Sequence, residues 1–337
     1  TLISSTFYLF NMFNNQKSLQ LPYTLSVLVI LIGATVLVGW IGSINFLKSL
    51  SPGWVSMKSN TAISFILCGL AILFLRSKNW QQKLSLIFTG IVMLFSIFTL
   101  LQYFLKADLF IDELFFNDRN NLVGTASPGR QSPVASICFF IFSLSVFSAF
   151  KKTNSKSFFQ YANLLIIIVA FVSLSGYILN SRLLFGFQGC SNMAFHTALA
   201  FILLAAACLF LFPAYGFMKL FTSRRNTGII LRKNLPGFVF VVLILGWLHL
   251  QGEQAGLYDF ELGFALFILV LIIFFSVQLT RIALALAKKE DQQRISEQMI
   301  LKANANLEMA EMQAKLGNWE YNSGTRECSW SKQMYRI

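Results

Sequence analysis

The chain has 337 residues, of which 56% are hydrophobic and 12% are charged. Soluble domains are about one-quarter charged, so this composition excludes an ordinary water-soluble protein and predicts that lipid covers much of the surface. The net charge of +13 does not indicate a nucleic-acid partner. The basic residues lie in short connections between apolar runs, as in membrane proteins, and the usual nucleic-acid-binding motifs are missing.

Eight apolar segments are predicted to cross the bilayer as helices, which requires about 20 residues for each crossing. They are residues 22–47, 59–75, 84–105, 132–150, 158–179, 194–212, 235–250 and 260–287. The seventh is short, and the eighth is long enough to leave the membrane and continue as a cytoplasmic helix. We therefore expect an all-α polytopic membrane domain over residues 1–287.

The distribution of Lys and Arg predicts the orientation of this domain. In the connections, twelve basic residues fall on the side of the N-terminus and six fall on the opposite side. The positive-inside rule then places the N-terminus in the cytoplasm, and an even number of spans places the C-terminus there too. We expect a multi-pass protein of the bacterial inner membrane, with membrane lipid as a partner.

A four-residue motif occurs three times, each time at the start of an apolar segment. The copies are Ser59-Asn60-Thr61-Ala62, Ser132-Pro133-Val134-Ala135 and Phe195-His196-Thr197-Ala198. Ser, Asn, Thr and Pro suit the first turn of a helix, and all three copies fall at the outer face. The unit is expected to be a helix pair used three times, with a fourth pair appended. The copies are either simple helix starts or the frame of a small ligand pocket in the outer leaflet.

A second distinctive stretch is Gly246-Trp247-Leu248-His249, followed by Gly256-Leu257-Tyr258-Asp259. Trp and Tyr are typical of the aromatic belt at a membrane interface, and the alternative is a loop that covers the outer face. Together with the motif copies, this stretch defines a candidate sensing pocket. Its residues are Asn60, Thr61, Pro133, His196, Thr197, Trp247, His249, Tyr258 and Asp259.

Neither a metal site nor a catalytic site is predicted. The two histidines, His196 and His249, both fall at the outer face, where Cys190 or Glu253 can join them, but the cysteine spacing carries no zinc or disulfide pattern. No nucleotide site or resident cofactor is expected in these residues. The spans also lack the rows of carboxylates that mark ion pathways, which counts against a transporter.

Residues 288–316 differ in composition, because they are charged, rich in Gln and free of Pro. An apolar seam with three- and four-residue steps predicts a helical stalk that forms a weak coiled coil, and so a homodimer. The seam consists of Ile295, Met299, Lys302, Ala305, Met309, Met312 and Leu316. The alternative is a single solvated helix.

The last segment, residues 317–337, is predicted to begin a mixed α and β domain. Residues 317–321 alternate like a short strand, Ser323-Gly324 is a turn signal, and residues 325–330 suit a second strand. Ser331 suits the N-cap of a helix that begins at Lys332.

This segment resembles the opening of a PAS domain, in particular the PAS domains of bacterial sensor histidine kinases. The matching residues are Gly317-Asn318-Trp319-Glu320-Tyr321, Thr325, Trp330-Ser331 and Met334-Tyr335-Arg336-Ile337. The membrane part is similar to an N-terminal sensor region of some such kinases and of some diguanylate cyclases. That similarity rests on Asn60-Thr61-Ala62, His196-Thr197-Ala198, Gly246-Trp247 and Gly256-Leu257-Tyr258-Asp259, and Val134 departs from it.

The resemblance implies that the chain is a fragment, namely the signal-input region of a two-component sensor histidine kinase with a truncated PAS start. ATP and a response regulator are then expected only for the downstream kinase. His196 and His249 do not suit the phosphoacceptor, because both lie in membrane context at the outer face. The alternatives are the input region of a diguanylate cyclase or phosphodiesterase and, less favoured, a transporter.

Overall fold

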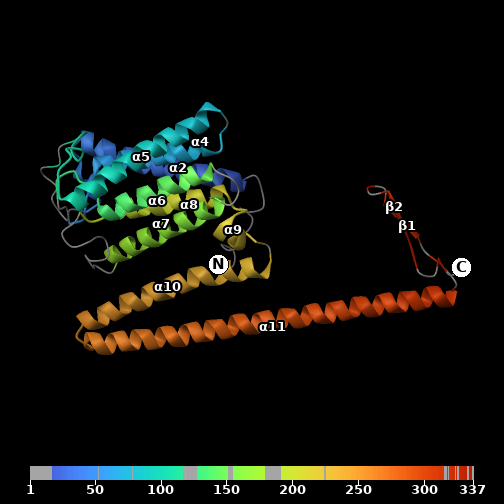
Figure 1. Ribbon diagram of the computed structural model, residues 1–337. Helices are drawn as coiled ribbons and strands as arrows, with labels where there is room; N and C mark the ends of the chain where they lie inside the picture. Colours follow the sequence, from blue (N-terminus) through green and yellow to red (C-terminus); the bar gives the residue numbers. More distant parts are fainter. Residues whose placement is uncertain are drawn as a thin grey trace. The chain divides into compact units, whose positions relative to one another are not determined.

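The computed structural model describes residues 17–51, 53–77, 79–116, 118, 127–150, 155–178, 191–223, 225–314, 317, 319–322, 324, 326–331, 334 and 335. Its helices are α2 (Lys17–Ile41), α3 (Asn45–Ser49), α4 (Ser59–Leu75), α5 (Trp80–Leu105), α6 (Pro133–Ala149), α7 (Ser155–Ile178), α8 (Phe195–Leu211), α9 (Gly216–Phe221), α10 (Asn226–Gln254) and α11 (Phe260–Ala314). The strands are β1 (Trp319–Asn322) and β2 (Glu327–Trp330) (Figure 1). The chain divides into two units, Thr1–Asp259 and Phe260–Ile337.

The predicted helical membrane architecture is confirmed in its coarse form. In the described part of the chain, α2, α5, α7, α10 and α11 are long and apolar enough to span a membrane. The helices α4, α6 and α8 have 17 residues each. A helix of that length rises about 26 Å. This is close to the shortest helix that crosses a hydrocarbon layer about 30 Å thick. All eight predicted segments are therefore helical, and the number of membrane crossings stays a prediction.

The predicted bounds differ most at the first and seventh helices. The first helix ends at Ile41, where the positive φ of Ser43 interrupts it before α3 begins. The seventh begins at Asn226 and includes Pro236 in its interior. The eighth continues without a break to Ala314, in agreement with the predicted helical continuation. Hydropathy locates an apolar run, whereas a helix extends as far as its backbone hydrogen bonds continue, so the polar first turns of α10 were not predicted.

Six helices of the first unit form a closed ring. Each of α2, α4, α5, α6, α7 and α8 packs against the next, and α8 packs against α2 (Figure 1). The short helices α4, α6 and α8 also touch one another. They are mostly buried, whereas the long helices α2, α5 and α7 bury only 28–39% of their apolar windows. The arrangement is thus three long–short pairs around a central axis, as expected from the threefold repeat.

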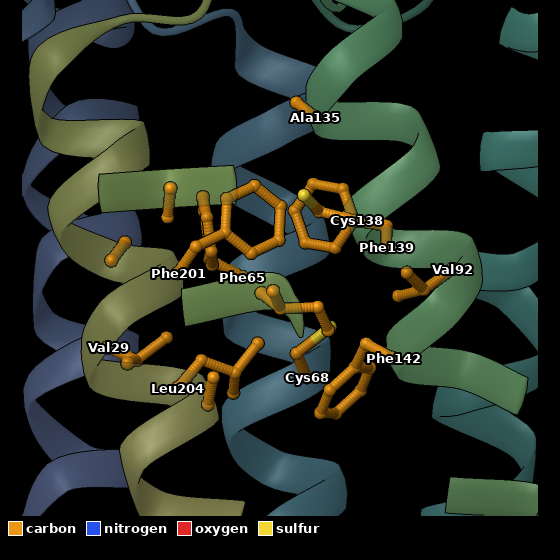
Figure 2. Close-up of a cluster of buried hydrophobic side chains, with 14 of the residues drawn as sticks. Val29, Phe65, Cys68, Val92, Ala135, Cys138, Phe139, Phe142, Phe201 and Leu204 are labelled. Atoms are coloured by element: carbon orange, nitrogen blue, oxygen red, sulfur yellow. The ribbon is translucent and has the colours of Figure 1, made fainter. Parts of the chain in front are cut away.

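A triangle of phenylalanine rings occupies the centre of this ring of helices (Figure 2). The ring centroids are 4.9 Å apart for Phe65 and Phe139, 4.7 Å for Phe65 and Phe201, and 4.6 Å for Phe139 and Phe201. Aromatic rings at such separations attract each other beyond simple burial. Along the sequence each Phe follows the residue at the N-cap position of its helix by the same number of residues, and these N-cap positions are Lys58, Ser132 and Ala194. The sequence motif pairs Ser132 with Ser59, whereas the helix starts pair Ser132 with Lys58. The structural alignment of the second copy is therefore shifted by one residue.

The second unit consists of α11 followed by a β-hairpin. The strands pair antiparallel, with Trp319 opposite Trp330 and Tyr321 opposite Cys328. In the turn, Gly324 N donates to Asn322 Oδ1 at 2.9 Å. Both predicted strands are therefore present, although a hairpin alone is too small to establish a PAS domain. The helix start predicted at Lys332 lies outside the described residues.

Candidate functional site

The ends of the ring at which α4, α6 and α8 begin form one polar region, called the motif end below. It contains five residues of the predicted pocket, which are Asn60, Thr61, Pro133, His196 and Thr197. Four of these, all except Pro133, are polar and expose 6% of their surface or less. Polar groups buried so deeply require partners, so the contacts that surround them decide what this region can do.

Three aromatic side chains tie the long helices to the starts of the short ones. Each sits near the end of a long helix and donates to the main-chain oxygen just before an N-cap residue. The pairs are Trp40 Nε1 to Met57 O at 3.0 Å, Tyr103 Oη to Gln131 O at 3.0 Å, and Tyr177 Oη to Met193 O at 2.8 Å. We call them the aromatic tethers. Sequence reasoning missed them, although an aromatic residue with a polar tip in the last turn of each long helix is a readable signal.

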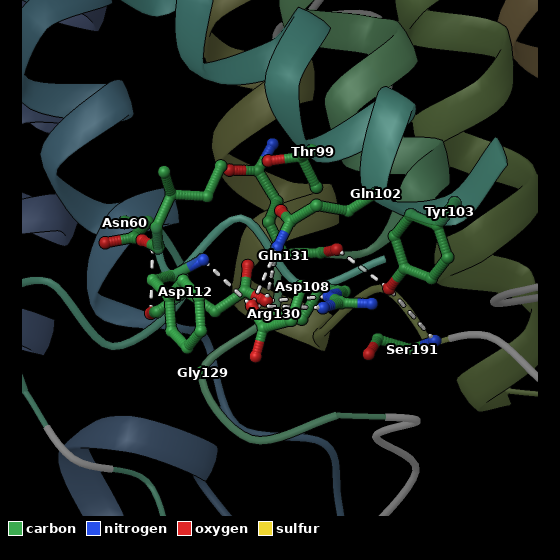
Figure 3. A network of polar contacts seen from close by, with 12 residues as sticks. Asn60, Thr99, Gln102, Tyr103, Asp108, Asp112, Gly129, Arg130, Gln131 and Ser191 are labelled. Atoms are coloured by element: carbon green, nitrogen blue, oxygen red, sulfur yellow. Dashed lines mark hydrogen bonds and ion pairs between the residues drawn. The ribbon is translucent and has the colours of Figure 1, made fainter. Parts of the chain in front are cut away.

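A buried carboxylate organises the connection between α5 and α6 (Figure 3). Asp112 Oδ2 accepts hydrogen bonds from Arg130 Nε at 2.7 Å and from Gln102 Nε2 at 3.0 Å. Asn60 Nδ2 donates to the main-chain oxygens of Ile111 at 2.9 Å and Asp112 at 3.0 Å. Asn60 therefore pins this connection to the start of α4, which gives one predicted pocket residue a structural role.

Burial and charge act in opposite directions on Asp112. Burial raises the pKa of its carboxyl above the ordinary value, while the hydrogen bond and positive charge of Arg130 lower that pKa. Arg130 also lies 5.6 Å from the centre of the Tyr103 ring and 3.8 Å from the exposed Asp108 carboxylate. The guanidinium is thus enclosed by an aromatic face and two carboxylates, an arrangement that suits a structural clamp.

A second buried ion pair joins Lys58 to Asp118. The same Asp118 oxygen accepts from Gly129 N at 3.1 Å, and Lys58 Nζ also donates to Ser56 Oγ at 3.2 Å. Burial lowers the pKa of Lys58, and the Asp118 carboxylate opposes that shift. Lys58 is the N-cap residue of α4, so this pair fixes the connection before α6 to the first short helix.

The three short helices do not begin in the same way. In α6, Ser132 Oγ accepts from Ala135 N at 3.1 Å and Pro133 follows the cap, as the sequence predicts for a capped start. In α4 and α8 no side chain caps the first turn. At the uncapped start of α8 the His196 ring is buried and lies against the main chain of Lys48, which offers it a hydrogen-bond acceptor.

The remaining predicted pocket residues form a different group at the end of α10. Tyr258 Oη donates to His249 O at 3.0 Å, and the two rings stack with centroids 6.0 Å apart. Trp247 is 45% exposed, and Asp259 is also at the surface. In the described part of the chain, α10 packs against α9 and has no comparable packing against α4, α6 or α8. The structure therefore does not bring the two groups into one pocket.

No metal centre is evident in the described residues, where no three His, Cys, Asp or Glu side chains lie close enough to share an ion. Cys190, which the sequence offered as a possible member, lies outside the described residues. No family model, curated protein or solved structure matches the chain.

Proposed function

We propose that this chain is the membrane-bound signal-input region of a sensor histidine kinase. The main support for this proposal is the length of α11. This helix runs through 55 residues from an apolar segment into a charged one and ends just before the hairpin. A helix of that length extends about 80 Å. A rotation or axial shift imposed on its apolar part reaches the hairpin, because no proline interrupts it.

The hairpin supports a PAS domain as the receiver of this signal. Its pairing places Trp319 opposite Trp330, and both residues belong to the stretch that resembles a PAS opening. In this proposal ATP and a response regulator bind only to the downstream kinase, membrane lipid surrounds the helices, and the cytoplasmic side of the bacterial inner membrane holds both termini.

A homodimer through α11 is part of the proposal. Ile295, Met299, Met309 and Met312 are each more than half exposed, at 55%, 61%, 55% and 53%. Apolar side chains repeated along one helix face are stabilised when a second copy covers them. Histidine kinases that phosphorylate in trans require such a dimer, and a parallel stalk places the two outputs side by side.

A transporter is less well supported. The ion pairs Lys58–Asp118 and Arg130–Asp112 both lie at the motif end, and no carboxylate lies in the middle of a described apolar helix. Ion and proton pathways usually place such groups inside the bilayer.

An input region for a diguanylate cyclase or phosphodiesterase has the same helices and hairpin, and it differs only in the output.

The test changes the helical phase of α11 in the gene product that contains this chain. In membrane vesicles, we expect transfer of phosphate from ATP to a histidine. Insertion of two residues after Ala303 rotates the distal stalk by about 200° and should change the rate, whereas insertion of seven rotates it by only about 20° and should restore it.

The seven-residue insertion is the matched control, because it lengthens the stalk more and rotates it less. Equal rates for both insertions would show that α11 does not relay a rotation. Formation of a cyclic dinucleotide in place of phosphohistidine would establish the cyclase alternative.

A further inference from the structure

The connection between α5 and α6 has buried charged side chains and exposed apolar ones. Asp112 and Asp118 expose only 6% and 2% of their surface, and they pair with Arg130 and Lys58. By contrast, Phe110 is 85% exposed. In the described part of this connection the exposed large apolar side chains are Leu109, Phe110, Leu114 and Phe115. A loop that faces water normally has the opposite arrangement.

The connection between α2 and α4, which contains α3, shows the same reversed polarity. Lys48 is 6% exposed, and its Nζ lies over the Trp40 ring, 4.6 Å from the centroid. Phe46, on the same short helix as Lys48, is 66% exposed. In the described part of this connection the exposed large apolar side chains are Ile44, Phe46 and Leu50. Two connections that differ in sequence thus share one polarity, which indicates that they share the same surroundings.

The backbone is strained at two of these exposed apolar residues. Leu50 and Phe110 have φ angles of 51° and 59°, in the left-handed region that bulky residues rarely adopt. Local hydrogen bonds hold both residues: Leu50 N donates to Phe46 O at 2.9 Å, and Phe110 N donates to Asp108 Oδ1 at 2.9 Å. In water such a loop would combine backbone strain with an exposed phenyl ring. An apolar environment offsets both costs.

Both connections continue the apolar surface of the long helix before them. The last residue of α2, Ile41, is exposed, and Ile44 follows it in the connection. In α5 the last two residues, Phe104 and Leu105, are exposed, and Leu109 follows them. These long helices are apolar enough to span a membrane, and most of that apolar length is not buried by protein. Lipid covers such helices in a membrane, and the same partner fits the reversed connections.

Exposed charges limit how deep the connections can lie. Lys106 and Asp108 are at the surface, and a charged group in the hydrocarbon centre is costly. At the headgroup layer, charged side chains reach water while apolar side chains reach the acyl chains. The main chain is also provided for, because Asn60 Nδ2 donates to the carbonyl groups of Ile111 and Asp112. These contacts fit the boundary between headgroups and acyl chains.

We propose that both connections lie in the interfacial layer of the membrane at the motif end, with an apolar rim inserted among the acyl chains of that leaflet. The apolar rim consists of Ile44, Phe46, Leu50, Leu109, Phe110, Leu114 and Phe115. Its partner is the lipid bilayer itself, so lipid contacts the connections as well as the helices. The inference goes beyond the proposed signalling role and holds for any output domain.

Spin labels on the apolar rim test the proposal in phosphatidylcholine nanodiscs. Single cysteines are placed at Phe46 and Phe110, at Leu94 in the middle of α5, and at Gln298 in the charged part of α11. Electron paramagnetic resonance compares access to oxygen, which dissolves in lipid, with access to a nickel chelate, which stays in water. The ratio of oxygen access to chelate access at both rim positions should approach that at Leu94. It should be at least threefold higher than the ratio at Gln298.

The native thiols do not interfere with this measurement. Cys190 and Cys328 are first replaced by Ser, and Cys68, Cys138 and Cys208 are buried. Chelate access at the rim equal to that in the charged part of α11 would place the rim in water and overturn the proposal. Low access to both reagents, or dipolar broadening between rim labels, would show that a second copy or another protein segment covers the rim. Either result would also overturn it.

A stability measurement tests the same point without a label. Asn adopts the left-handed backbone more easily than Phe, so Phe110→Asn should stabilise the chain if Phe110 faces water. If Phe110 contacts lipid, the lost apolar contact outweighs that gain, and the unfolding temperature in nanodiscs should fall by several degrees. An unchanged or higher unfolding temperature would contradict the proposal.

The matched control is Lys106→Asn. Lys106 is exposed on the same connection and has a φ of 51°, so the variant relieves a similar backbone without removing an apolar ring. Its unfolding temperature should not fall. If it falls as far as that of Phe110→Asn, the effect does not come from lipid contact and the proposal fails. No output domain takes part in these measurements, so the phosphotransfer test of the proposed function is independent of them.

Discussion

At the scale of single residues, the motif copies act through main-chain contacts more than through their own side chains. The aromatic tethers reach the carbonyl groups of Met57, Gln131 and Met193, and in lipid such groups need internal partners. Ser132 alone caps its helix as the sequence predicts. Asn60 and His196 were named as candidate pocket residues, and the structure gives both a local role: Asn60 pins the connection after α5, and the His196 ring lies against the main chain of Lys48.

Removal of a tether hydroxyl should destabilise the ring of helices. Tyr177→Phe leaves Met193 O without its donor and should cost about 1 kcal/mol of unfolding free energy. Tyr103→Phe should cost more, because Tyr103 Oη also accepts from Ser191 N at 3.4 Å. The measurement is denaturant unfolding in mixed micelles.

Tyr161→Phe is the matched control, since Tyr161 lies on the same helix as Tyr177 and is 56% exposed. Its unfolding free energy should equal that of the wild type. If all three variants unfold alike, the tethers do not contribute measurably to stability.

At the scale of elements, apolar length and the motif predicted much of the helix order. The start of α4 at Ser59 and its end at Leu75 were predicted from hydropathy alone. The burial of the short helices was not predicted. They are shorter and on average more apolar than α2, α5 and α7, but lipid and a protein core both favour apolar side chains, so only packing distinguishes a lipid-facing helix from a central one. The hairpin was predicted from turn chemistry, since Asn322 and Gly324 form the turn by a local contact. The candidate pocket stays a prediction, and nothing in the sequence shows that α10 packs against α9 and not against α4, α6 or α8.

The seam along α11 should determine which positions of two copies come together. In a parallel coiled coil Met309 and Met312 fall at core positions, while Glu311 and Ala314 fall on the outer face. Single cysteines at Met309 and Met312 should therefore crosslink between copies in membranes at least tenfold faster than cysteines at Glu311 and Ala314. The native Cys328 is exposed, so it is first replaced by Ser.

Glu311 and Ala314 lie within two residues of Met312, so local mobility and distance from the membrane are matched. Similar rates at all four positions would mean that no defined seam exists. The dimeric stalk would then be lost from the proposal, while a relay through a single helix would remain.

At the scale of the whole molecule, charge separates the two ends of the ring of helices. The two buried ion pairs lie at the motif end. At the other end basic side chains contact the end of α8: Lys156 Nζ lies 5.3 Å from the Phe212 ring centre, and Arg76 Nη1 donates to Leu211 O at 3.5 Å. Basic residues in the connections at this end agree with the cytoplasmic side, and the count of twelve against six basic residues predicts that the motif end faces outward.

Topology mapping tests both the orientation and the number of crossings. A reporter after Lys152 should lie in the cytoplasm, because the twelve basic residues on that side favour retention there. If all eight apolar helices cross, a reporter after Glu253 lies outside and one after Asp291 lies inside. If only the five longer helices cross, these last two positions exchange sides while Lys152 stays inside.

Two fusions are made at each position. One carries alkaline phosphatase, which is active only outside the cytoplasm, and the other carries a fluorescent protein that matures only in the cytoplasm. The two reporters at one position should therefore give opposite signals. An outside result after Lys152 would overturn the orientation itself. An inside result after Glu253 together with an outside result after Asp291 would instead show that α4, α6 and α8 do not cross the membrane. The stalk and hairpin would then lie on the outer side of the membrane, and no ATP-dependent kinase can act there. The proposed function would therefore fail together with the predicted topology.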